Sequence, residues 1–232
     1  MDVFGNALKD YYQKGKTETL WLYNSYDEPE EMPVDIFFRE DDEMPTLEHK
    51  AMNACYGKVL DVGAGVGSHA LLLQKMNIDV TAIDICADAV MIMKQRGVKK
   101  AFQQDIFSAT EKFDTLLFLM NGIGLTGTLA GFTEFLKKAK ALIEPEGQLI
   151  FDSSDISYLY EELPKPKNKY FGEVSYCYQY QKQKGNWFNW LYLDQETLIH
   201  IANQNGWQCD IIFDDGEDQY LAKLFLPKYR QY

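Results

Sequence analysis

The chain has 232 residues, of which 46% are hydrophobic and 14% aromatic, and its formal net charge is −12 at pH 7. This hydrophobic content excludes an intrinsically disordered protein, and the length suffices for one domain with a substantial core. The acidic balance disfavours a nucleic-acid partner, because phosphate recognition depends on clustered lysine and arginine side chains.

The cysteines are too widely spaced to predict a zinc site or a redox pair, and no metal is expected. They are Cys55, Cys86, Cys177 and Cys209. The chain opens without a signal-peptide pattern, and no apolar run reaches the roughly 18 residues of a membrane span. These features predict a soluble, cytoplasmic protein with no membrane partner.

Residues 1–56 differ in composition from the rest of the chain. Apolar side chains from Phe4 to Tyr12 recur at spacings of three and four, which is typical of an amphipathic helix. Acidic, proline-bearing segments follow, and they leave the region too interrupted for a core of its own. We therefore expect an N-terminal helical lid packed on the remainder.

An alternation of strands and helices begins at residue 57, which predicts a parallel sheet with right-handed crossovers. The expected strands are 58–62, 79–84, 101–103, 113–120 and 147–152, and the expected helices are 67–76, 88–96 and 128–141.

The last third departs from this alternation. Residues 174–182 and 187–192 predict a β-hairpin inserted after the fifth strand. A helix over 194–205 and an antiparallel strand pair, 207–213 and 219–226, complete the chain.

The fold class expected is therefore α/β, with a doubly wound, Rossmann-like, mostly parallel sheet of seven strands and an antiparallel last strand. A single domain would span 1–232: a lid (1–56), a ligand-binding half (57–152), a loop with the inserted hairpin (153–192) and a C-terminal helix with the strand pair (193–232).

A glycine-rich turn follows the first strand of the alternation, in the run Asp61-Val62-Gly63-Ala64-Gly65-Val66-Gly67. Glycines at alternate positions allow positive φ and let a ligand approach the backbone closely. The third glycine falls one residue earlier than in the dinucleotide fingerprint G-x-G-x-x-G, and no Lys-Ser or Lys-Thr follows to make a P-loop.

With Asp61 before the first glycine and Asp84 closing the next strand, residues 57–152 resemble the class I S-adenosylmethionine-dependent methyltransferases. Asp105 after the third strand and Asn121 after the fourth agree with that pattern. The resemblance implies S-adenosylmethionine as cofactor, S-adenosylhomocysteine as product, and in-line methyl transfer to a small-molecule acceptor.

The resemblance also implies a role for each cofactor-binding residue. Asp61 would hold the methionine ammonium, Asp84 the two ribose hydroxyls, and Asp105 the adenine amine. Ile85 and Ile106, each next to one of these acids, would face the adenine ring. Backbone groups of the turn would hold the methionine portion. The full set is Asp61, Gly63, Ala64, Gly65, Gly67, Asp84, Ile85, Asp105, Ile106 and Asn121.

Catalytic groups are poorly defined by the sequence. His69 follows the glycine turn, and Asp152 and Asp155 follow the fifth strand, so these three are candidates. Capping or packing is the alternative explanation for each of them, and a base is needed only where the acceptor must lose a proton. Arg39 either reaches the cofactor carboxylate or offsets its acidic neighbours.

Several alternatives stay open. The glycine turn also suits a nicotinamide-dependent oxidoreductase, or a non-catalytic cofactor-binding protein of the same fold. A protein or peptide acceptor is a further alternative if the aromatic residues of the lid and hairpin leave an open groove. The acceptor's identity, the atom methylated and the oligomeric state are not specified by the sequence.

Overall fold

The computed structural model describes residues 2–161 and 164–227, and its centre is a seven-stranded sheet in the order β11-β12-β7-β6-β3-β4-β5. The strands are β3 (Lys58–Val62), β4 (Asp79–Asp84), β5 (Ala101–Gln103), β6 (Phe113–Phe118), β7 (Ile143–Ser154), β11 (Gln208–Asp214) and β12 (Gln219–Phe225). β3 to β7 pair in parallel, whereas β12 is antiparallel to both β7 and β11. The predicted doubly wound, mostly parallel sheet is confirmed.

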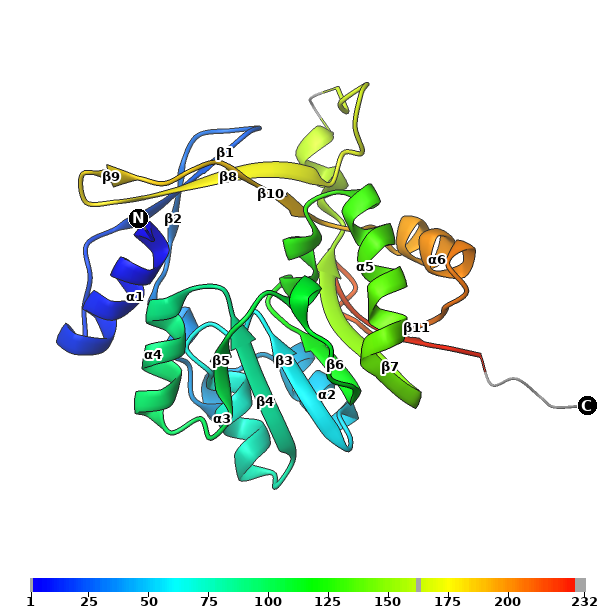
Figure 1. Ribbon diagram of the computed structural model, residues 1–232. Helices are drawn as coiled ribbons and strands as arrows, with labels where there is room; N and C mark the ends of the chain where they lie inside the picture. Colours follow the sequence, from blue (N-terminus) through cyan, green and yellow to red (C-terminus); the bar gives the residue numbers. More distant parts are fainter. Residues whose placement is uncertain (1, 162–163, 228–232) are drawn as a thin grey trace, which may run out of the picture.

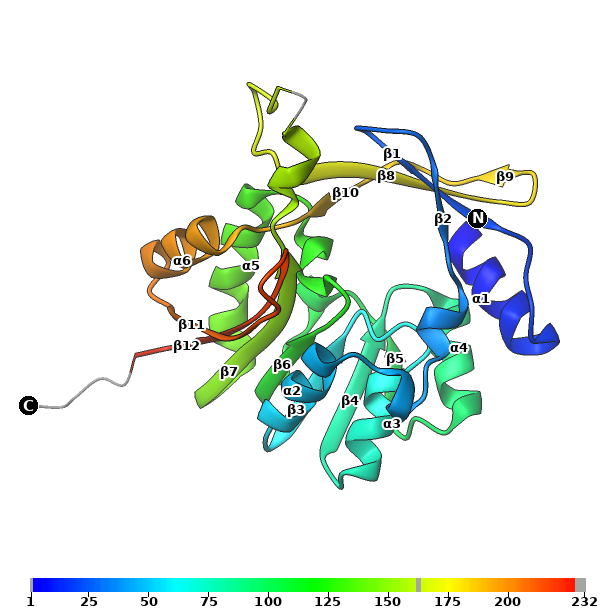
Figure 2. The ribbon, with the colours of Figure 1, turned by 180° about the vertical axis from the view of Figure 1, so that it is seen from behind.

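Helices cover both faces of this sheet (Figures 1 and 2). They are α2 (Thr46–Ala54), α3 (Ser68–Lys75), α4 (Ala87–Arg96), α5 (Leu129–Leu142) and α6 (Gln195–Gln204). Apolar residues of α5 and α6 pack on one face of the sheet, and those of α2 and α3 pack on the other. A strand covered on both faces must be apolar on both, which explains the apolar run Leu116–Phe118 in β6.

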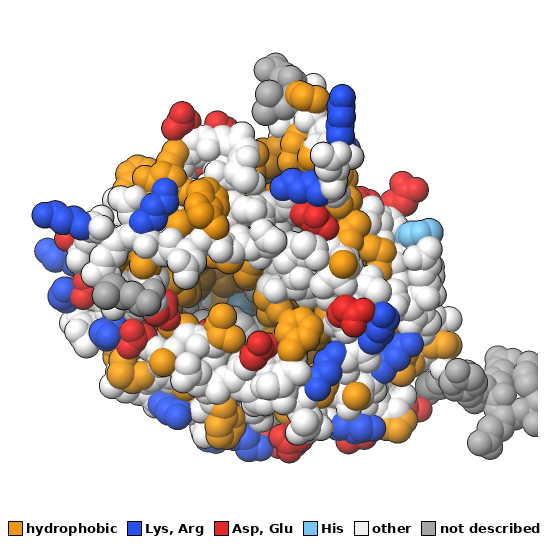
Figure 3. Space-filling model, turned by 45° about the horizontal axis from the view of Figure 1, so that its top comes forward, with side chains coloured by type: hydrophobic (Ala, Val, Ile, Leu, Met, Phe, Trp, Pro, Cys, Tyr) orange, Lys and Arg blue, Asp and Glu red, His pale blue; other side chains and the backbone are white. Residues whose placement is uncertain are grey.

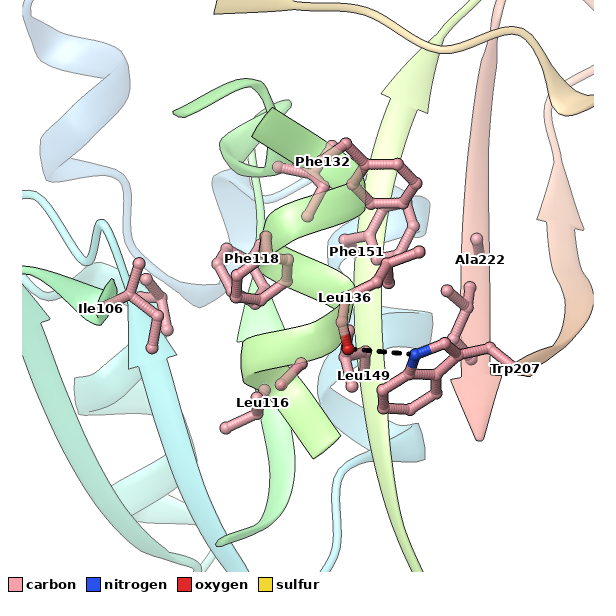
Figure 4. Close-up of a cluster of buried hydrophobic side chains, with 14 of the residues drawn as sticks. Ile106, Leu116, Phe118, Phe132, Leu136, Leu149, Phe151, Trp207 and Ala222 are labelled. Atoms are coloured by element: carbon pink, nitrogen blue, oxygen red, sulfur yellow. Dashed lines mark hydrogen bonds between the residues drawn. The ribbon is translucent and has the colours of Figure 1, made fainter. Parts of the chain in front are cut away.

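The C-terminal strand pair is tied to the core through Trp207. This indole is buried among Phe132, Leu136, Phe151 and their neighbours, and its Nε1–H donates to the Leu136 carbonyl at 3.2 Å (Figure 4). A buried tryptophan needs a partner for that N–H. The contact therefore fixes the start of β11 against α5.

Residues 2–56 contain the helices predicted for the lid and also two strands that were not predicted. The amphipathic helix is present as α1 (Val3–Lys14), but Leu20–Asn24 forms strand β1 and Glu30–Met32 forms strand β2. The strands were not predicted because the five residues of β1 show no sign in the sequence of their pairing partner, β-strand residues about 150 positions away.

That partner is the inserted hairpin, whose presence is confirmed. Its strands are β8 (Glu173–Tyr180), β9 (Gln183–Lys184) and β10 (Phe188–Leu191). β8 pairs antiparallel with β1 on one side and with β10 on the other, which gives a second sheet in the order β10-β8-β1-β2. A two-stranded hairpin is marginal alone, and the added strands stabilise it.

We call this second sheet, β1, β2 and β8–β10, the roof. It extends across the end of the molecule where the parallel strands of the main sheet terminate, with α1 at its side (Figures 1 and 2). α1 packs against α4, and β10 packs against the short helix η4 (Gly122–Thr126) that follows β6. Both junctions hold the roof over the carboxyl ends of the strands.

Among the helices within residues 2–161 and 164–227, none is long and apolar enough to cross a membrane.

Candidate functional site

The glycine turn joins β3 to α3, and its three glycines have φ values of +68°, +55° and +85°. At Gly67 a Cβ atom would lie 2.7 Å from Val98 Cγ2 and 2.9 Å from Met93 Cγ, so this glycine lets the turn pack on α4 and the segment after it. At Gly63, which is exposed, a Cβ atom would meet nothing within 4 Å. Gly67 is thus needed for packing, while Gly63 leaves the backbone open to a ligand.

The N–H groups of the turn are used within the protein. Those of Gly63 and Ala64 donate to the Ile83 carbonyl at 2.9 and 3.1 Å, and that of Gly67 donates to the Ala64 carbonyl at 2.8 Å. The Gly65 N–H donates to Asp84 at 2.9 Å. The turn therefore offers a ligand open space and carbonyl oxygens, which suit an ammonium group.

Asp84 lies at the end of β4, beside the turn. Its Oδ2 accepts from Gly65 N–H and its Oδ1 accepts from Cys86 N–H at 2.8 Å. Burial raises the pKa of this carboxyl, and the two amides partly offset that effect. Each oxygen keeps a further lone pair, so a pair of hydroxyls can still donate to it. The next residue, Ile85, is 73% exposed and presents an apolar surface at the same edge.

Replacing Ile85 with serine is expected to lower the affinity for S-adenosylhomocysteine about fivefold, near 1 kcal/mol, because adenine loses an apolar contact area. Stability should change by less than about 0.5 kcal/mol, since the side chain is exposed. Calorimetric titration and thermal unfolding measure the two effects. Ile199→Ser, on the outer part of α6 and 36% exposed, is the matched control. An equal effect of both variants on affinity contradicts this assignment.

Asp105 and Ile106 lie after β5 and differ in what they offer. The Ile106 side chain is only 3% exposed and belongs to the main core, so it leaves little surface for an adenine ring. Asp105 is exposed and caps a short helical turn by accepting from Phe107 N–H at 2.9 Å. Its contact with the adenine amine stays a prediction.

The backbone is strained where β6 ends. Met120 and Asn121 have φ values of +60° and +56°, two successive left-handed residues that are not glycine. Asp152 at the end of β7 holds this bend, because both of its oxygens accept from Asn121 N–H, at 3.0 and 2.9 Å. The Ser154 hydroxyl donates to Asn121 Oδ1 at 3.2 Å. Asn121 is thus fixed at the end of β6, and its contact with a ligand stays a prediction.

A cluster of ionisable side chains lies buried beside the turn, and we call it the ionic cluster. Arg39 donates to Glu48 Oε1 at 2.6 Å, and Glu48 Oε2 lies 2.7 Å from His69 Nε2. Asp61 and Asp152 complete the cluster and are buried as well. Five ionisable groups, of which Arg39 is half-buried, thus come from α2, α3, β3, β7 and the segment before α2 to one end of the main sheet.

Burial and mutual attraction set the proton affinities in the ionic cluster. Burial raises the pKa of Asp61 to about 6 and that of Asp152 to about 7. Burial acts to lower the pKa of His69, but the Glu48 hydrogen bond and the nearby carboxylates raise it above its usual value. Burial acts to raise the pKa of Glu48. The hydrogen bonds and positive charges of His69 and Arg39 nevertheless hold that pKa below its usual value.

The three catalytic candidates named from the sequence lie in two different places. His69 and Asp152 lie together in the ionic cluster, whereas Asp155 caps a short helix by accepting from Ser157 N–H at 2.8 Å. Arg39 pairs with Glu48 and not with its neighbours in the sequence. Sequence reasoning missed Glu48, although its spacing places it on the apolar face of α2 with Ala51 and Met52, where an acid is unusual.

The site fits S-adenosylmethionine. Among the described residues, Asp61 Oδ2 is the one buried side-chain oxygen or nitrogen without a hydrogen-bond partner, and a ligand ammonium would supply it. Asp84 and Ile85 lie at the other side of the glycine turn, where ribose and adenine would follow. A hollow opens beneath the roof, with hydrophobic side chains on its wall and a histidine side chain at its floor (Figure 3). Within the described part of the chain, no cluster of His, Cys, Asp or Glu is arranged to hold a metal ion.

Comparisons with known proteins agree with this geometry. A family model described as a methyltransferase domain matches residues 31–210. A crystal structure of an S-adenosylmethionine-dependent methyltransferase from Bacteroides fragilis, in complex with S-adenosylhomocysteine, is 39% identical with a TM-score of 0.90, over 98% of this chain and 95% of that one.

More distant relatives share the domain or the fold. The putative methyltransferase YqeM of Bacillus subtilis is 22% identical over 172 residues, which are 70% of this chain and 66% of that protein's length. The methyltransferase CcbJ from Streptomyces caelestis has a TM-score of 0.62 at 12% identity, over 82% of this chain and 99% of that one. At that identity the likeness shows the fold alone.

Proposed function

The chain belongs to the methyltransferase-domain family and is an S-adenosylmethionine-dependent methyltransferase, and we propose that its acceptor is a small molecule bound beneath the roof. Family membership sets aside the nicotinamide-dependent oxidoreductase and the non-catalytic alternative. The position of the roof over the glycine turn is the observation that supports a small acceptor.

The roof approaches the cofactor site through aromatic side chains. The Tyr178 ring stacks on Phe4 of α1 with the ring centroids 5.1 Å apart. Burial raises the pKa of the Tyr178 phenol, and the nearby Tyr192 and Asp84 add to this effect. A Cβ atom at Gly65 would lie 4.0 Å from Phe37 Cδ1, so the segment after β2 also reaches the turn. These contacts enclose the space above the turn, which favours a small molecule over a peptide lying in an open groove.

The inner side of the roof supplies both apolar surface and hydrogen bonds. The hydroxyls of Tyr26, Tyr176 and Tyr192 form a chain, with oxygen distances of 3.4 and 3.1 Å. Burial raises the pKa of each, so all three remain neutral phenols at physiological pH. The rings of Phe188 and Trp190 lie beside them. We expect an acceptor with an apolar body and at least one polar group.

The chain's own residues orient the reaction and can remove a proton. When bound, the cofactor supplies a methyl group made electrophilic by its sulfonium. Asp61 and Asp84 would hold its two ends, and the roof would exclude water, so that alignment accounts for much of the acceleration. Where the acceptor carries a proton, we assign its removal to Asp152, whose pKa of about 7 suits a base at neutral pH. His69 is held by Glu48, and Asp155 serves as a cap.

The proposal is tested by following the labelled methyl group. Purified protein is incubated with a cell extract and methyl-labelled S-adenosylmethionine, and the products are divided by ultrafiltration. We expect label in the small-molecule filtrate, at least tenfold above that obtained with Asp84→Ala. Label confined to the protein or nucleic-acid fraction contradicts a small acceptor.

Two further features belong to this proposal. We place the enzyme in the cytoplasm, which the four free thiols of Cys55, Cys86, Cys177 and Cys209 support, because reducing conditions keep thiols unpaired. We treat the chain as one domain without a nucleic-acid partner, which its net charge of −12 favours. Cell fractionation and a nucleic-acid binding assay test these points.

A further inference from the structure

The methionine end of S-adenosylmethionine carries a carboxylate as well as an ammonium, and Asp61 can answer only the ammonium. We infer that His69, oriented by Glu48 and Arg39, binds the methionine carboxylate through its Nδ1–H. The inference rests on the proposed function, since it concerns the same cofactor site. Arg39, a candidate for this carboxylate from the sequence, instead acts at a distance.

Hydrogen bonds fix the direction of the imidazole ring. Both oxygens of Glu48 are engaged, Oε1 by Arg39 at 2.6 Å and Oε2 by His69 Nε2 at 2.7 Å. With Nε2 facing Glu48, the other ring nitrogen must face away from it. No residue within 2–161 or 164–227 makes a hydrogen bond to Nδ1. That nitrogen is therefore the donor left for a ligand.

The position of the ring places this donor at the methionine end of the site. His69 lies in the first turn of α3, two residues after Gly67, and its side chain is 9% exposed. It is close enough to Asp61 for each to affect the other's proton affinity. A ligand whose ammonium meets Asp61 thus brings its carboxylate within the neighbourhood of His69.

The charges around His69 also favour a bound carboxylate. Glu48, Asp61 and Asp152 surround the ring, and their negative potential raises the pKa of His69 despite burial. A raised pKa favours the imidazolium form, whose two N–H donors would serve Glu48 and the ligand. The positive ring of His69 and the negative carboxylate of Asp61 match the carboxylate and the ammonium group of an α-amino acid. Glu48 and Arg39 are positioning residues, because they act on the ligand through His69.

The inference is tested with two ligands that differ only in the carboxylate. Affinities are measured by calorimetry for S-adenosylhomocysteine and for the thioether analogue in which hydrogen replaces the carboxylate. We expect the unmodified protein to prefer S-adenosylhomocysteine at least tenfold. His69→Gln can keep a bond to Glu48 but lacks the second ring donor, and its preference should fall below threefold. His69→Leu and Glu48→Gln should also reduce the preference.

Each other outcome is decisive. His200→Gln, at the exposed histidine of α6, should leave the preference unchanged. If His69→Gln keeps a tenfold preference, or weakens both ligands by the same factor, His69 serves only structure and the inference is overturned. If the unmodified protein binds both ligands equally, the carboxylate is not recognised and the inference fails alone. If it binds neither, the cofactor site itself fails.

Discussion

Asp84→Ala is expected to lower the affinity for S-adenosylhomocysteine at least tenfold and up to about a thousandfold. Hydrogen bonds from the ribose hydroxyls to the carboxylate are lost. One bond to a charged group contributes about 1.5–3 kcal/mol, which gives the tenfold minimum, and partial loss of a second bond extends the range. The N–H groups of Gly65 and Cys86 also lose their acceptor, which loosens the turn. Calorimetric titration measures the change directly.

The matched control for this variant is Asp79→Ala. Asp79 is the first residue of the same strand, β4, and lies at the opposite end from Asp84, where it is exposed and paired with Lys100. It should leave the affinity within about twofold of the unmodified protein, since exposed ion pairs contribute little. If Asp84→Ala binds as tightly as Asp79→Ala, the ribose is not held at the end of β4.

Asp61→Asn should weaken cofactor binding at least tenfold and yet stabilise the ligand-free protein at pH 8. The affinity falls because an amide carries no charge to attract the methionine ammonium. The stability rises because Asp61 is 1% exposed with one unpartnered oxygen, and removing its charge removes an unfavourable burial. The expected gain is about 1–3 kcal/mol, from a pKa raised by roughly two units.

Because folding raises the pKa of Asp61, the stability that this residue contributes depends on pH in a definite direction. The folded-state pKa of Asp61, about 6, is higher than the usual aspartate value of 3.8, so the folded protein holds this proton more tightly than the unfolded chain. Stability attributable to Asp61 therefore falls as the pH rises from about 4 to above 6. His69 lowers this pKa and Asp84 raises it, so the window depends on both neighbours.

Urea unfolding between pH 4 and pH 8 provides the measurement and its internal control. Near pH 4 Asp61 is mostly protonated in the folded state and only partly ionised in the unfolded chain, so the variant should match the unmodified protein there within about 1 kcal/mol. At pH 8 the variant should be the more stable of the two. A variant that is less stable at pH 8 would show that the Asp61 charge supports the fold rather than the ligand.

The main sheet was largely predictable from the sequence because its evidence is local. Strands β3, β4 and β5 have the predicted bounds, and the acids at Asp61 and Asp84 close two of the predicted strands. Apolar runs bounded by glycine turns indicate buried parallel strands whatever lies elsewhere in the chain. The cofactor turn could be identified for the same reason, since its glycines and acid occupy seven consecutive positions.

The roof could not be predicted in the same way. β1 and β8 pair between Leu22 and Tyr178, and no short-range pattern records a partner so distant in the chain. The aromatic residues of both segments were visible, but each fits simple packing as well as a strand of a second sheet. Only pairing in three dimensions distinguishes those outcomes.

The sequence by itself determined the fold class, the methyl donor and the acids expected to hold it, because these depend on residues adjacent in the chain. The tertiary structure alone decided which charges meet. It paired Arg39 with Glu48, turned His69 toward Glu48 and left Asp61 with a free oxygen. It also directed the N–H groups of the turn inward. Burial and hydrogen bonding set these partners and proton affinities, and both arise only when distant segments pack together.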